Sequence, residues 1–161
     1  MKKQKQLIVF FSRTGNTKKA AEALASVLKC DIEELSDKKG SKSRKGLFGW
    51  LRSGKEGMKR IMVDIEQTKT NPANYDLVII GTPNWGSNIA SPVRTYLTNN
   101  KSKFKKVAFF CTMSGESPGK TFIDMEQACG KKPVRCIGIR ARTVKKGEHI
   151  SQIKDFAGSL K

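Results

Sequence analysis

The sequence predicts an α/β protein in which helices cover both faces of a parallel β-sheet. Two observations lead to this fold class. Five segments with strand character alternate with segments of helical periodicity, which is the pattern of repeated strand–helix–strand units. The clearest strand segments are continuous apolar runs, which are typical of strands buried on both faces.

The first half of the chain begins this alternation. The run QLIVFF at Gln6–Phe11 ends at a polar turn and predicts a buried strand. Apolar residues at helical spacing then predict a helix over Thr17–Lys29. The segment CDIEEL, Cys30–Leu35, alternates in polarity and is expected to be an edge or second strand.

The second half repeats the pattern more regularly. Tyr75–Pro83, Lys105–Thr112 and Val134–Arg140 are expected to be strands. Between and after them, helices are predicted at Pro92–Leu97, where proline suits a first turn, at Thr121–Cys129, which Gly130 ends, and at Glu148–Leu160.

The chain as a whole has the composition of a folded globular protein. Its 161 residues, 37% of them hydrophobic, are most simply one domain spanning 1–161. No apolar stretch approaches the roughly 18–20 residues of a membrane span. The N-terminal apolar run is too short for a signal peptide, so we expect a cytoplasmic protein whose first strand follows exposed lysines.

Cysteine and histidine spacing argues against a metal site. Cys30, Cys111, Cys129 and Cys136 form no CxxC pair, and His149 is the only histidine. We expect isolated buried thiols. The segment CGKKPVR has the CxxxxxR spacing of a phosphatase loop, but here the order is helix then strand, so Cys129 is expected to be structural.

Charge is the unusual global property, with a formal net charge of +18. Lys38–Arg60 holds nine basic residues against Glu56 alone, and Lys131–Lys146 holds seven with no acidic residue. Such segments attract anionic partners by steering that salt screens. We expect an acidic redox protein as partner, although a membrane surface or nucleic acid stays open without a motif to support it.

The basic segment also has amphipathic spacing, although three glycines weaken the helix. The favoured interpretation is a crossover helix that packs its apolar side on the sheet and leaves its lysines in water. The alternative is a helix for a membrane surface or an acidic partner. The apolar positions are Leu47, Phe48, Trp50, Leu51, Met58, Ile61 and Met62.

Three polar loops follow predicted strands, and ligands bind at the carboxyl ends of such strands. The loop SRTGNT at Ser12–Thr17 offers hydroxyls, an amide and a glycine before a helix N-terminus, which suits a phosphate. A plain turn with an N-cap explains these residues equally well. The second loop, Thr82–Asn88, carries Trp85, which we take to be poorly placed for the core and suited to stacking on a flat ligand. The alternative is that Trp85 covers a helix end. The third loop is Thr112–Gly119.

These loops resemble those of the flavodoxins, along essentially the whole chain. FFSRTGNT is similar to the family's FMN phosphate loop, and GTPNWGSN to its first flavin-contacting loop. The resemblance implies FMN as cofactor and a doubly wound sheet of order 2-1-3-4-5 with FMN at its switch point. It implies a phosphate site at Ser12, Arg13, Thr14, Gly15, Asn16 and Thr17.

The resemblance also implies the residues around the flavin ring. Trp85 would stack on the ring, and Gly86 matches the glycine whose carbonyl turns toward flavin N5 in the semiquinone. The third loop would close over the other side of the ring. The implied ring-side residues are Thr82, Pro83, Asn84, Trp85, Gly86, Thr112, Met113, Ser114 and Gly115.

Two features depart from electron-carrying flavodoxins. The third loop has no Tyr or Trp, so one face of the flavin is expected to be open to a substrate or covered by something else. The charge is basic, whereas those carriers are typically acidic. The leading hypothesis is an FMN-binding electron carrier with no catalytic side chain. The alternatives are an NAD(P)H-dependent FMN reductase acting on quinones or similar acceptors, and a basic binding module without FMN.

Overall fold

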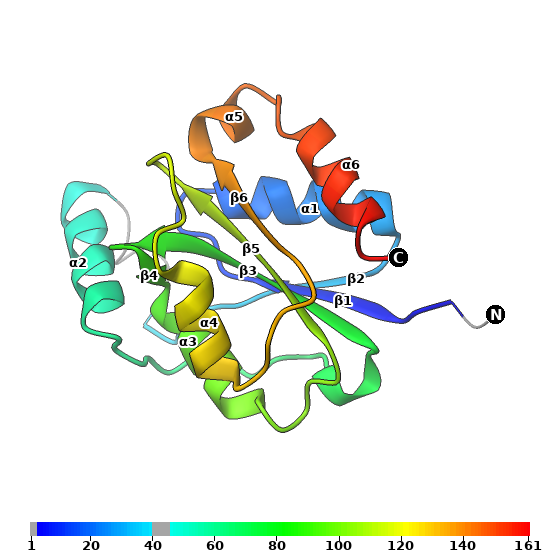
Figure 1. Ribbon diagram of the computed structural model, residues 1–161. Helices are drawn as coiled ribbons and strands as arrows, with labels where there is room; N and C mark the ends of the chain where they lie inside the picture. The colour runs from blue at the N-terminus through cyan, green and yellow to red at the C-terminus, as the bar shows by residue number, and fades with distance from the viewer. Residues whose placement is uncertain (1–2, 40–45) are drawn as a thin grey trace.

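A twisted parallel sheet forms the centre of the molecule in the computed structural model, which describes residues 3–39 and 46–161 (Figure 1). Its strand order is β2-β1-β3-β5-β6, and every neighbouring pair on this path is parallel. The strands are β1 Gln6–Phe10, β2 Asp31–Glu34, β3 Leu77–Trp85, β5 Val107–Met113 and β6 Cys136–Arg140. With the two-residue β4 set aside, this is the expected 2-1-3-4-5 order.

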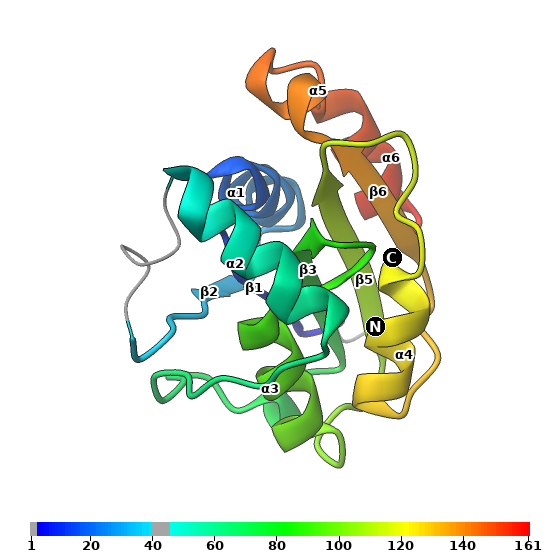
Figure 2. The ribbon, with the colours of Figure 1, turned by 90° about the vertical axis from the view of Figure 1, so that its left-hand side faces the viewer.

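Helices cover both faces of this sheet. On one face α1 (Asn16–Leu28) and α6 (Ile150–Gly158) pack together, and on the other α3 (Ser91–Asn100) packs beside α4 (Thr121–Cys129) (Figures 1 and 2). The predicted fold class is therefore confirmed.

Alternate residues of the central strands divide the core into two layers. In β1, Ile8 and Phe10 join a cluster with α1 and α6, whereas Leu7 and Val9 join a cluster with α3 and α4. All four side chains are buried. This is why the run is continuously apolar: each residue faces one of two covered layers.

Four features differ from the expected elements. β3 continues to Trp85, and the two-residue strand β4 (Asn88–Ile89) pairs with its end in antiparallel fashion. The helix α5 (Ala141–Lys145) directly follows β6, and the 3₁₀ turn η2 (Pro72–Asn74) precedes β3. β4 and α5 are too short to produce a periodic signal in the sequence.

The orientation of α2 (Gly46–Met58) contradicts the expectation for the basic segment. The helix buries its small and polar side, whose buried residues are Gly49, Ser53, Glu56 and Gly57. Its large apolar side chains, Leu47, Phe48, Trp50, Leu51 and Met58, are exposed. The expected packing of the apolar side on the sheet is thus wrong.

A close approach between α2 and β3 explains this orientation. A Cβ atom on Gly57 would lie 2.2 Å from the backbone oxygen of Trp85, so only glycine permits this contact. α2 therefore lies against the carboxyl end of β3, where Figure 2 shows it in front of the sheet. Three cations of the basic segment, Lys42, Arg44 and Lys45, lie outside the described residues.

Candidate functional site

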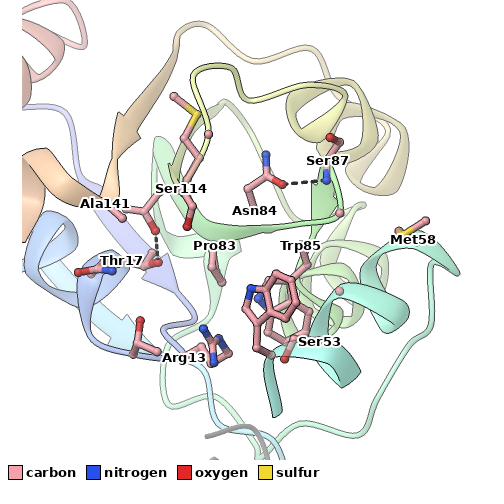
Figure 3. A pocket seen from close by; sticks show the side chains of 18 of the residues that line it. Arg13, Thr17, Ser53, Met58, Pro83, Asn84, Trp85, Ser87, Ser114 and Ala141 are labelled. Carbon is pink, nitrogen blue, oxygen red and sulfur yellow. Dashed lines mark hydrogen bonds between the residues drawn. The ribbon is translucent and has the colours of Figure 1, made fainter. Parts of the chain in front are cut away.

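The three polar loops meet around one cavity of about 690 Å³ at the carboxyl ends of β1, β3 and β5 (Figure 3). Twelve of the fifteen residues expected at a cofactor line it. They are Arg13, Thr14, Asn16, Thr17, Pro83, Asn84, Trp85, Gly86, Thr112, Met113, Ser114 and Gly115.

The other three expected residues lie behind the lining and shape the loops. The Ser12 hydroxyl accepts hydrogen bonds from the Gly15 N–H at 3.1 Å and the Lys18 N–H at 3.2 Å. Gly15 precedes α1 with a φ of 99°, a left-handed conformation that favours glycine. Thr82 is fully buried, and its hydroxyl accepts the Ala90 N–H at 3.0 Å.

The first loop presents a helix N-terminus to the cavity. Asn16 and Thr17 open α1, and their N–H groups have no acceptor within the helix. The Thr17 hydroxyl is hydrogen-bonded to that of Thr112 at 2.6 Å, which ties the first loop to the third. Together with the positive end of the helix dipole, this arrangement suits an anion.

The second loop is a tight hairpin turn. Gly86 and Ser87 have φ values of 59° and 63°, as a two-residue type I′ turn requires between β3 and β4. Asn84 accepts the Ser87 N–H at 2.8 Å, as Figure 3 shows, and donates to the Pro118 carbonyl at 3.0 Å. The Asn88 amide donates to the Gly86 carbonyl at 2.8 Å. The turn is thus held from both sides and tied to the third loop.

Trp85 belongs to the core as well as to the cavity. Its side chain is 4% exposed and packs edge-to-face on Phe11, with the ring centroids 5.7 Å apart. The expectation that Trp85 is poorly placed for the core is wrong, because β3 extends two residues beyond Pro83 and carries Trp85 under α2. Stacking of a flavin on Trp85 stays a prediction.

One wall of the cavity comes from α2, which sequence reasoning did not place there. The residues outside the expected set are Trp50, Leu51, Ser53, Gly54, Lys55, Met58, Lys59, Ser87, Ser117 and Ala141. The spacing of Gly49, Ser53 and Gly57 at every fourth position was the available signal, since it marks a helix face narrow enough for a close approach.

The cavity is lined by cations, and a buried ion pair supports its hairpin. Burial lowers the pKa of Arg13 from its usual value, although an arginine stays charged. Lys55 and Lys59 add positive charge on the α2 side.

Behind the hairpin, Asp124 accepts two hydrogen bonds from Arg94 and one from the Ile89 N–H at 3.3 Å.

The cysteines and the histidine lie away from this cavity. Cys111 and Cys129 are buried, and burial raises the pKa of Cys111 to about 12. Cys136 is exposed and Cys30 is half-buried, so the expectation of buried thiols is wrong for these two. Within residues 3–39 and 46–161, no three His, Cys, Asp or Glu side chains gather as metal ligands.

Over the same residues, no helix is both long and apolar enough to span a membrane.

Comparison with known proteins identifies the family. The family model for flavodoxin matches residues 5–140. The chain belongs to the flavodoxin family. No curated protein matches it.

Several solved flavodoxin-like structures share this fold. A flavoprotein from Lactobacillus acidophilus in complex with FMN has a TM-score of 0.72 at 25% identity, over 89% of this chain and 97% of that one. The apo-form of that flavoprotein has a TM-score of 0.63 at 23% identity, over 86% and 93%. Two-electron reduced flavodoxin from Megasphaera elsdenii has a TM-score of 0.60 at 18% identity, over 97% and 99%.

An unpartnered hydroxyl in the cavity tests whether the lining residues suit FMN. Ser53 is 1% exposed and lines the cavity, and its hydroxyl has no hydrogen-bond partner among the described residues. A buried polar group without a partner is costly, so the site is complete only when something bonds to it. The volume lies within the usual range of small-ligand pockets. The residues therefore fit a cofactor with polar edges, such as FMN.

Proposed function

We propose that the protein binds FMN in this cavity and transfers electrons between redox partners through it. The observation that carries the proposal is the convergence of three loops from β1, β3 and β5 on one cavity, with a helix N-terminus at one end and aromatic residues at the other. The bound flavin supplies one- and two-electron chemistry, and the protein supplies binding, orientation and electrostatics.

The phosphate of FMN is proposed to bind at the start of α1. The N–H groups of Asn16 and Thr17 are the donors that this helix leaves unpaired, and the side chains of Thr14 and Asn16 add further polar contacts. Ser12 positions this loop from behind through its two hydrogen bonds. Arg13, which belongs to the same loop, contributes positive charge.

The flavin ring is proposed to lie between β3 and α2. Trp85 supplies one aromatic contact, and Trp50 supplies the second aromatic that the third loop lacks. Ser53 lies on the same helix and gives the ring or its ribityl chain a hydrogen-bond partner. The wall formed by α2 would thus cover the flavin face that the sequence left open.

The test is titration of purified, flavin-free protein with FMN and with riboflavin, followed by visible absorption and flavin fluorescence. FMN should bind with a characteristic spectrum. Thr14→Ala and Asn16→Ala should weaken FMN much more than riboflavin, because only FMN has the phosphate. Absence of FMN affinity would overturn the proposal, and equal loss for both flavins would overturn the phosphate assignment.

A second candidate function, an NAD(P)H-dependent reductase of quinones or similar acceptors, is favoured by one observation. Lys55 and Lys59 line the cavity and could attract a nicotinamide phosphate. The FMN-loaded protein should then oxidise NAD(P)H without an added reductase. If NAD(P)H leaves the flavin oxidised while a separate reductase reduces it, the protein is a carrier.

A further inference from the structure

The exposed side of α2 carries large apolar side chains that none of the described residues buries. Leu47 and Phe48 are 69% and 86% exposed, and Leu51 and Met58 are also more than half exposed. Leu47, Leu51 and Met58 are spaced by four and seven residues, which places them on one side of the helix. Leu51 and Met58 lie where this side meets the cavity, whereas Leu47 and Phe48 do not line it. Ile61 and Met62 extend this exposed apolar character just beyond the helix.

The charge around this exposed side is positive. Lys55 and Lys59 lie on α2 or directly after it and also line the cavity. Arg52 pairs with Glu56, and Arg60 Nε lies 3.6 Å from Oδ1 of the buried Asp124. The one acidic residue, Glu56, is buried on the inner side of the helix and accepts a hydrogen bond from Arg52 Nε at 2.8 Å. The surface thus offers solvent large apolar side chains and cations.

We propose that this surface of α2 docks on an anionic lipid bilayer. A second copy of the chain is a poor occupant, because each copy would bring the same cations to the interface and the net charge is +18. An anionic bilayer complements the cations and takes up projecting apolar side chains without requiring a matching groove. Phe, Leu and Trp beside Lys and Arg are the composition of helices that lie in a membrane interface.

The position of α2 gives this docking a consequence for the cavity. Leu51, Met58 and Lys59 lie on α2 or beside its end and also line the cavity. Docking would therefore bring the mouth of the cavity to the bilayer surface, where apolar electron acceptors dissolve. That consequence rests on the proposed FMN function, whereas docking itself does not.

Vesicle co-sedimentation of the full-length protein tests the inference, with phosphatidylcholine vesicles that contain or lack phosphatidylglycerol. We expect binding that requires phosphatidylglycerol and weakens as salt rises. Phe48→Ser and Leu47→Ser should each weaken it about tenfold, as expected for one large apolar side chain leaving the interface. Ile150→Ser, which removes an exposed apolar side chain from α6, is the matched control and should bind as the wild type.

Two outcomes would overturn the inference. If the wild type does not bind anionic vesicles, the inference fails, and Phe48-dependent binding of poly-glutamate would then identify an acidic protein as the occupant. If Phe48→Ser and Leu47→Ser bind vesicles as the wild type does, total charge alone drives the binding and α2 is not the docking surface. Unfolding in urea should be nearly unchanged in Phe48→Ser and Leu47→Ser, since these two side chains are 86% and 69% exposed. FMN titration of the same variants separates a failure here from a failure of the proposed function.

Discussion

The contact between α2 and β3 gives a sharp prediction, because two glycines of the same helix differ only in what surrounds them. A Cβ atom on Gly57 would lie 2.2 Å from Trp85 O and 2.6 Å from Trp85 Cβ. A Cβ atom on Gly54 would meet nothing within 4 Å. Gly54 lies inside α2 and Gly57 is its second-last residue, so Gly→Ala brings a gain in helix propensity of up to about 1 kcal/mol at Gly54 and no more than that at Gly57.

The free energies of unfolding of the two variants should therefore differ mainly by the cost of the steric overlap between the new Cβ atom at position 57 and Trp85. Gly54→Ala should raise the free energy of unfolding by about 0.5–1 kcal/mol. Gly57→Ala gains no more helix propensity than Gly54→Ala, but it must displace α2 from the backbone of β3. Overpacking of this kind costs about 1–3 kcal/mol. We expect Gly57→Ala to be less stable than Gly54→Ala by about that amount.

Urea unfolding of the flavin-free proteins measures this difference without interference from a ligand. Hydrogen exchange of the α2 amides adds a local readout, which should be faster in Gly57→Ala because the helix is moved off β3. Equal unfolding free energies together with equal exchange in the two variants would refute the close approach. The buried side of α2 would then lie elsewhere.

Four further predictions follow from single groups. Ser53→Ala should leave the flavin-free protein equally or more stable in urea, yet weaken FMN binding about threefold to tenfold, the worth of one neutral hydrogen bond; unchanged FMN affinity would remove Ser53 from the site. Asp124→Asn should lower the free energy of unfolding by about 3–5 kcal/mol, because it leaves a buried guanidinium without its charged partner, and a loss below that of surface variants would contradict this. Burial lowers the pKa of His149 below 6.5, so the folded protein favours the neutral ring and its stability from this group is complete above pH 6.5 and is lost as the pH falls. His149→Gln should therefore reduce the loss of stability that urea unfolding measures between about pH 7 and 5. Lys55→Gln combined with Lys59→Gln should make the reduction potential of bound flavin more negative, because cations stabilise its anionic reduced form, and a redox titration without such a shift would exclude an electrostatic role for them.

The sequence predicted the sheet well because its strands are long apolar runs. Gln6–Phe10 and Val107–Met113 lie within two residues of their expected ends, and the strand order follows from the family resemblance. The ends of β3 were harder to predict. Pro83 looked like the last strand residue, but β3 continues to Trp85 because β4 pairs with it, and this pairing places the indole in the core.

The lining of the cavity could be predicted only where it comes from loops after strands. Thr14, Asn16 and Gly86 follow strands directly, so topology brings them to one edge of the sheet. Ser53 and Trp50 come from a helix whose position depends on side-chain packing. Sequence periodicity marks the apolar side of such a helix but does not say which side meets the sheet.

The reversed orientation of α2 connects the cavity, the stability of the helix and the outer surface. Small residues on the inner side allow α2 to reach Trp85, so its large apolar residues are left to line the cavity, as Leu51 and Met58 do, or to face solvent, as Phe48 does. A variant that fills the inner side should therefore disturb the cavity without altering the composition of the outer surface, whereas Phe48→Ser should do the reverse. We expect Gly57→Ala to lose FMN affinity and keep vesicle binding, and Phe48→Ser to show the opposite pattern. That pair of results would establish that one helix serves two separable surfaces. Loss of both properties in both variants would mean instead that α2 acts as a single unit, folded or displaced as a whole.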